Sequence, residues 1–186
     1  MNILVDKLPT EYEGLKVNTD FRSFILFELL MQDNKIDKRE KIILSLNLFY
    51  DEPPKDIKKA IDGIVWFYTR GKKAKKNKNT NSIKENKKNI YSYEHDADYI
   101  YAAFKDQYGV DLNEIEHLHW FKFKSMFDGL KNDNKICEIM GYRSIDINAI
   151  KNKDEQRKYK KLQREWALPD ERTDEEKEKD FAEALW

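Results

Sequence analysis

Residues 72 to 89 divide the 186-residue sequence into two stretches that follow the helical period. This segment consists mostly of Lys, Asn, Ser and Thr, and Ile83 is its one large apolar residue. Such a composition buries too little apolar surface to offset the entropy lost on ordering. We therefore predict a mainly α protein, a multi-helix bundle with an N-terminal and a C-terminal helical region. The predicted units are an N-terminal helical region (residues 1–71), a basic flexible linker (residues 72–92), a C-terminal helical region (residues 93–169) and an acidic tail (residues 170–186).

Three helices are expected before the linker, because apolar residues recur there every three to four positions. Thr19 or Asp20 is a suitable N-cap residue for the first helix and Asp37 for the second, and Glu40 completes a capping box after Asp37. The third pattern runs from Ile57 to Tyr68 and stops before Gly71. Residues 12–17, centred on a glycine, predict a short β-hairpin ahead of these helices.

After the linker, a helix is expected from about His95 to Tyr108, with Gly109 at its end. We predict that Asp111 caps one long helix, because six side chains then share a face: Leu112, Ile115, His119, Phe123, Met126 and Leu130. A short helix is expected between Asp133 and Met140, and a last pattern contains Tyr159, Leu162 and Trp166.

Composition excludes several classes of protein. Cys137 is the only cysteine, so an intrachain disulfide and a Cys-rich zinc site are both excluded. No apolar run approaches the roughly 18 residues that a membrane helix needs. The first residues also lack the pattern of a secretion signal, so we expect a cytoplasmic protein. The 35 basic and 35 acidic residues balance, which argues against general attraction to nucleic acid.

Positive charge is nevertheless concentrated around the linker. Residues 70–90 carry nine basic side chains and one acidic one. Lys72, Lys73, Lys75 and Lys76 are candidate contacts for a polyanion, in binding that salt would weaken. The alternative is a solvated loop, which we favour because the segment lacks the interleaved aromatic residues on which bases stack.

The acidic tail is the candidate partner-binding segment. Residues 170–186 carry eight acidic and three basic side chains, and their apolar members are costly to leave in water. Phe181, Leu185 and Trp186 are the predicted partner contacts. The tail has two interpretations, which the sequence leaves equal: a last amphipathic turn packed on the chain itself, or a peptide docked in a partner's groove.

No constellation of residues predicts catalysis. The three histidines are His95, His117 and His119. Residues two apart on a helix point roughly 200° apart, so the last two would not hold one ion unless the helix is broken there. We expect His119 to be a hydrogen-bonded core residue and His117 to be solvated. The sequence has no glycine-rich phosphate loop and no Gly-x-Ser-x-Gly motif. We therefore expect a protein without enzymatic activity, metal or cofactor.

Several short motifs, in order along the chain, resemble the bacteriophage gene product fifteen family. The resemblance extends over nearly the whole chain to Pro169 and leaves out the acidic tail and the exact sequence of the linker. The motifs that carry it are TDFR at 19–22, WFY at 66–68, DADYIYAAF at 96–104, QYGVDL at 107–112, LHWFKF at 118–123 and IMGYR at 139–143.

The resemblance implies a role in phage tail morphogenesis in the cytoplasm of the bacterial host. Genes of this family usually lie beside the gene for the tape-measure protein, in the place where tail assembly chaperones are encoded. The expected partner is the tape-measure protein, the tail-tube protein or both, with no membrane and with nucleic acid disfavoured. Two alternatives are a structural component of the virion tail or connector, and a nucleic-acid-binding factor that uses the basic linker.

Overall fold

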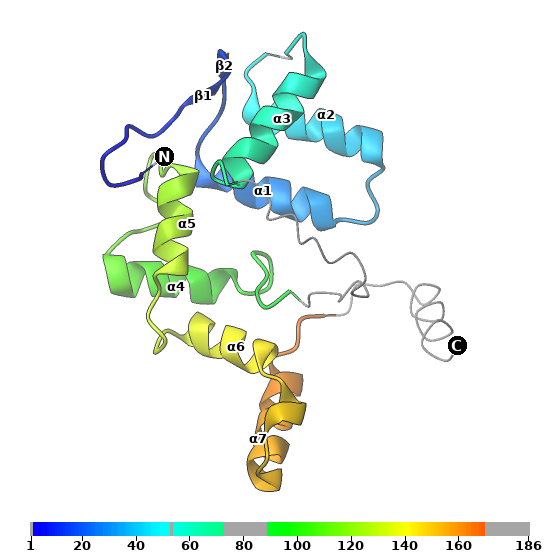
Figure 1. Ribbon diagram of the computed structural model, residues 1–186, viewed down its shortest axis with the longest axis vertical. Coiled ribbons are helices and arrows are strands. Elements are labelled where there is room, and N and C mark those ends of the chain that lie inside the picture. Colours follow the sequence, from blue (N-terminus) through cyan, green and yellow to red (C-terminus); the bar gives the residue numbers. More distant parts are fainter. Residues whose placement is uncertain (1, 53, 73–88, 170–186) are drawn as a thin grey trace.

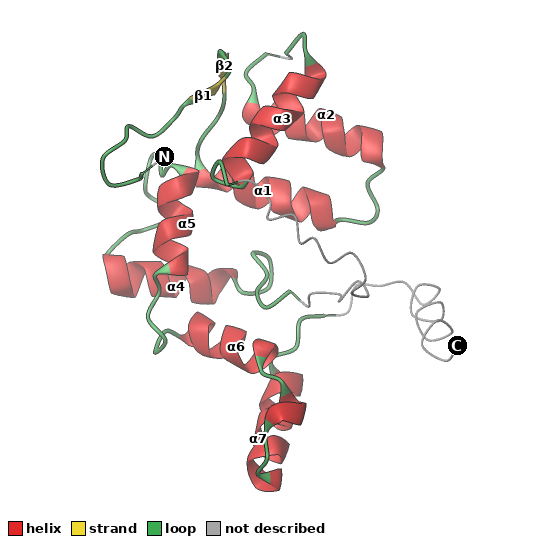
Figure 2. Ribbon diagram, viewed as in Figure 1, coloured by secondary structure: helices red, strands yellow, loops and turns green. Residues whose placement is uncertain are grey.

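The computed structural model describes residues 2–52, 54–72 and 89–169, which are mainly helical (Figure 1). A two-stranded antiparallel hairpin precedes the helices, as predicted (Figure 2). The elements are β1 (Glu11–Tyr12), β2 (Leu15–Lys16), α1 (Phe21–Gln32), α2 (Lys38–Phe49), α3 (Ile57–Tyr68), α4 (Ala97–Tyr108), α5 (Trp120–Asp128), α6 (Lys135–Ser144), a 3-10 turn (Ile147–Ala149) and α7 (Lys153–Glu165).

The hairpin is short and depends on the third helix for support. Its turn places Glu13 and Gly14 at positive φ, a conformation that glycine adopts without steric cost. The Tyr12 ring packs against Trp66 of α3, with the ring centroids 5.7 Å apart. Gly63 lets Tyr12 lie close to the helix, because a Cβ atom there would stand 3.2 Å from the Tyr12 ring.

The predicted N-caps of the first two helices are confirmed. The Asp20 carboxylate accepts a hydrogen bond from the Arg22 backbone N–H, and Asp37 accepts from the backbone of Arg39 and Glu40. Each cap satisfies backbone donors that have no partner within the first turn of the helix. Helix α6 begins one residue later than expected, with Asn134 rather than Asp133 at the N-cap.

One aromatic core joins the helices before residue 72 to those after residue 89. Phe123 of α5 is fully buried at its centre. Its ring stacks on Phe21 of α1 at 4.8 Å and on Phe104 of α4 at 5.0 Å. Trp120, one turn earlier, stacks on Phe24 at 4.9 Å. Helix α5 therefore connects the two predicted helical regions through stacked rings.

The long helix predicted from Leu112 to Leu130 is wrong, because the helix begins only at Trp120. Asp111 caps a single turn, after which the backbone pairs with the chain ahead of α1. The Phe21 N–H donates to the Leu118 carbonyl at 2.9 Å, and the Trp120 N–H donates to the Thr19 carbonyl at 2.8 Å. These contacts come from residues nearly a hundred positions away, so the local helical pattern does not reveal them.

Helix α7 lies at one end of the molecule and packs on α6 (Figure 1). Two glutamine side chains attach it. The Gln163 amide donates to the carbonyls of Tyr142, Arg143 and Ile145 at the end of α6, and the Gln156 amide donates to the Ile147 carbonyl. None of the residues of α7 is buried, so the helix keeps most of its surface in solvent.

Candidate functional site

The structure describes only some of the predicted site residues. Lys72 is exposed, and its backbone N–H donates to the Thr69 carbonyl at 3.1 Å. The other predicted polyanion contacts and all predicted partner contacts lie outside the described residues: Lys73, Lys75, Lys76, Phe181, Leu185 and Trp186. For these side chains the sequence-based assignments stay predictions.

The two neighbouring histidines have separate structural contacts. His119 is buried and acts as the N-cap of α5, as its Nδ1 accepts from the Phe121 N–H at 3.1 Å. Its Nε2 lies 2.9 Å from the Pro9 carbonyl oxygen, so the neutral ring with its proton on Nε2 satisfies both contacts. Burial lowers the pKa of His119. His117 is exposed and lies 3.3 Å from the Thr19 hydroxyl.

The predicted roles of these histidines are confirmed, since His119 is a hydrogen-bonded core residue and His117 is exposed. Within residues 2–52, 54–72 and 89–169, no three His, Cys, Asp or Glu side chains gather in a way that could hold a metal ion.

A half-buried polar cluster joins α1, α3 and α5, and the sequence did not reveal it. The Tyr68 hydroxyl donates to the Glu28 carboxylate at 2.9 Å. Burial raises the pKa of Glu28, against the opposing effects of this hydrogen bond and of Lys124. Burial also lowers the pKa of Lys124, although Asp128 lies 3.6 Å away and favours the charged form.

Aromatic rings surround the Lys124 ammonium group. Its Nζ atom lies 4.6 Å from the centroid of Phe127, 5.4 Å from that of Tyr91 and 5.9 Å from that of Trp120. Cation–π attraction to three rings helps to offset the loss of hydration. The protein's own lysine therefore fills this aromatic cage, and the cluster is better explained as a connection between helices than as a ligand site.

A buried ion pair between Asp96 and Arg143 joins the start of α4 to α6. Their side chains are 3% and 8% exposed. The Arg143 guanidinium donates to both carboxylate oxygens of Asp96 and also to the carbonyls of Ile90 and Trp166. Sequence patterns alone give no sign of this pair, because a partner 47 residues away leaves no local signal.

Exposed aliphatic side chains are concentrated on the first two helices. Among the described residues, ten large hydrophobic side chains are exposed, and five of them lie on α1 and α2. Leu26 is 51% exposed and Ile43 is 58% exposed. We call the set the aliphatic surface, and its members are Leu26, Met31, Ile42, Ile43 and Leu44. Ile42, Ile43 and Leu44 are consecutive, so they spread around the exposed part of α2 and do not form a single stripe. Single exposed leucines are ordinary on a soluble protein, but several on one helical pair favour an interaction surface.

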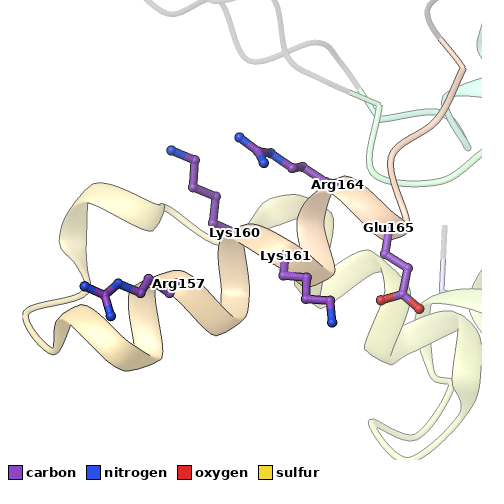
Figure 3. A pocket seen from close by; sticks show the side chains of 5 residues that line it. All are labelled: Arg157, Lys160, Lys161, Arg164 and Glu165. Carbon is purple, nitrogen blue, oxygen red and sulfur yellow. The ribbon is translucent and has the colours of Figure 1, made fainter.

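Two hollows mark the surface elsewhere. One of about 590 Å³ opens between α1 and α4, with Phe21, Ile25 and Ile100 among its apolar lining residues and Arg22 as its basic member. The other, of about 810 Å³, is a shallow concavity over α7 (Figure 3). All five of its lining residues are charged, four of them basic: Arg157, Lys160, Lys161, Arg164 and Glu165.

Comparison of the chain with models of protein families gave a match over most of its length. The model of the family described as Bacteriophage Gp15 protein matches residues 4–168, which include the hairpin and all seven helices named above. The chain belongs to the Gp15 family. This assignment confirms the resemblance found in the sequence motifs and identifies a bacteriophage protein. The matched range ends before the acidic tail.

Comparisons of this Gp15 family member with curated proteins and with solved structures found no relative. No curated protein and no solved structure matches the chain. In the described ranges 2–52, 54–72 and 89–169, none of the helices combines the length and the apolar character that a membrane crossing requires.

Proposed function

We propose that this Gp15 family member is a tail assembly chaperone that binds the tape-measure protein, the tail-tube protein or both. The observation that carries the proposal is the aliphatic surface on α1 and α2. A long helical partner presents apolar side chains every three to four residues, and paired helices offer a complementary surface. Membership of a bacteriophage family and the expected place of its genes beside the tape-measure gene support the same role.

The energetics of such a contact are favourable. Burying one leucine or isoleucine side chain contributes about 1.5–3 kcal/mol. Leu26 and Ile43 are slightly more than half exposed, so about half of that contribution is available to a partner. A charged residue at either position is therefore expected to weaken partner binding while it leaves the fold intact.

The experiment is co-expression of the tagged chain with the tape-measure protein and, separately, with the tail-tube protein. We expect at least one of them to co-purify with the wild-type chain. The Leu26→Asp, Ile43→Asp double variant should recover at least tenfold less partner. Leu4→Asp is the control, because Leu4 is 88% exposed but lies outside the aliphatic surface. Failure of both proteins to bind, or equal recovery by the double variant, refutes the proposal.

Mass spectrometry of purified phage particles separates a chaperone from the structural alternative. A chaperone is absent from the finished particle. Presence in a fixed number of copies would instead identify a component of the tail or connector. The proposed role includes no catalytic step, metal or cofactor.

A further inference from the structure

The outward face of α7 carries an uninterrupted basic stripe. Five cations occur at positions i, i+4, i+7, i+8 and i+11 of the helix: Lys153, Arg157, Lys160, Lys161 and Arg164. With 3.6 residues per turn, this spacing places their Cα positions within about 100° around the helix axis. The Lys161 side chain itself extends away from those of Lys160 and Arg164 (Figure 3). The half-buried side chains Gln156, Tyr159 and Gln163 lie on the adjacent face of the helix, and the two glutamines bond to α6 and the 3-10 turn.

Most of the stripe has no ionic partner within residues 2–52, 54–72 and 89–169. Arg157 pairs with Asp154 at 3.3 Å, in a contact where both side chains are highly exposed. None of the ion pairs among the described residues includes Lys160, Lys161 or Arg164. Like charges three and four residues apart destabilise a helix. The stripe therefore favours an anionic occupant, and Figure 3 shows Lys160 and Arg164 extending in the same direction from the helix.

We propose that the acidic segment 170–186 of the same chain docks on the basic stripe of α7. Its eight acidic and three basic side chains give a net charge of −5, which matches the five cations of the stripe. The connection is short, because only residues 166–169 separate α7 from this segment. A short tether raises the local concentration of the segment to about the millimolar range.

The geometry permits the contact. The stripe from Lys153 to Arg164 is about 16 Å long, at about 1.5 Å per helical residue. Eleven residues of extended chain span about 36 Å, so residues 170–180 are long enough to return along the whole stripe. The chain leaves α7 from a fixed point, since the Trp166 carbonyl accepts a 2.6 Å hydrogen bond from Arg143. An untethered polyanion such as nucleic acid has no comparable advantage of proximity.

Zero-length carbodiimide cross-linking of the full chain tests the proposal, since it joins only carboxylates and amines in direct contact. At low salt we expect links from Lys160 and Lys161 to Asp174, Glu175 and Glu176. The links should fall at least fivefold in 0.5 M NaCl, where charges are screened over a few ångströms. An equal mixture of unlabelled and ¹⁵N-labelled chains should show links within one copy. Absence of these links, or links only between copies, overturns the proposal.

Charge reversal provides the matched variants. Lys160→Glu with Lys161→Glu should abolish the links, and adding Glu175→Lys with Glu176→Lys should restore links of reversed polarity. The control is Lys38→Glu with Arg39→Glu at the start of α2, which should leave the links unchanged. Links that survive reversal on α7, or that the control removes equally, overturn the proposal.

A single-stranded oligonucleotide of 20 nucleotides tests the competing occupant. The wild-type chain should bind this probe at least fivefold more weakly than the variant Asp174→Asn, Glu175→Gln, Glu176→Gln, in which the segment has lost three charges. Equal binding by the two proteins would show that the stripe is open to nucleic acid and would overturn the proposal.

Discussion

Replacement of Arg143 by methionine is expected to cause a large loss of stability. The substitution leaves the Asp96 carboxylate buried without its cation, at 3% side-chain exposure. It also removes the donors to the carbonyls of Ile90 and Trp166, which lie 3.2 and 2.6 Å from Arg143 nitrogens. Removing one partner of a buried ion pair typically costs about 3–5 kcal/mol. For a chain of this size the midpoint of thermal unfolding should fall by about 10 °C.

Urea denaturation followed by tryptophan fluorescence and circular dichroism measures this effect. Arg157→Met is the matched control, because the Arg157–Asp154 pair is 79% and 90% exposed. Loss of that pair should change the free energy of unfolding by no more than about 0.5 kcal/mol. The two arginines thus differ in burial and in the number of acceptors, and not in the type of pair.

A double-mutant cycle tests the cause of the loss. Asp96→Asn combined with Arg143→Met should cost about 1–2 kcal/mol less than the sum of the two single changes, because the second change removes a charge that the first left unpaired. A cost below about 1 kcal/mol for Arg143→Met, or simple additivity of the single variants, would refute the reasoning.

Four further outcomes are expected. Phe123→Ala should lower the free energy of unfolding by about 3–5 kcal/mol, because its ring is fully buried; a urea midpoint close to that of wild type would contradict this. Gly109→Ala should cost about 1 kcal/mol in the same assay, since φ is +65° there and a Cβ atom would meet nothing within 4 Å. Burial lowers the pKa of His119 from 6.5, so the free energy of unfolding of the wild type should fall as pH drops below about 6.5. A His119→Asn variant should lose that dependence in denaturation curves recorded from pH 7.5 to 5. The pKa of Glu28 is raised from 4.5, so its pH dependence is opposite to that of His119: the contribution of Glu28 to stability declines as pH rises above 4.5. Glu28→Gln should remove that decline, and an unchanged pH profile of stability would contradict the assignment.

Short-range patterns were enough to place most of the helices. Asp20 and Asp37 cap the helices that the sequence predicts, and Gly109 ends α4 in the left-handed conformation. These signals act within four residues, through the first and last turns of each helix. The signal that predicted the hairpin around Gly14 is also local. The cations of the basic stripe of α7 also recur with a helical period. The sequence, however, predicted this helix from its apolar residues and not from its cations.

Contacts between distant residues decided the start of α5 and the polar contacts of the core. Residues 112–119 have an apolar pattern typical of a helix, yet backbone bonds to Thr19 and Phe21 hold them outside one. The partners of Asp96 and Glu28 lie 47 and 40 residues away. Local periodicity reports which face of a segment is apolar. The packing of the helices decides which carboxylate is buried and which cation pairs with it. Only the folded chain contains this information.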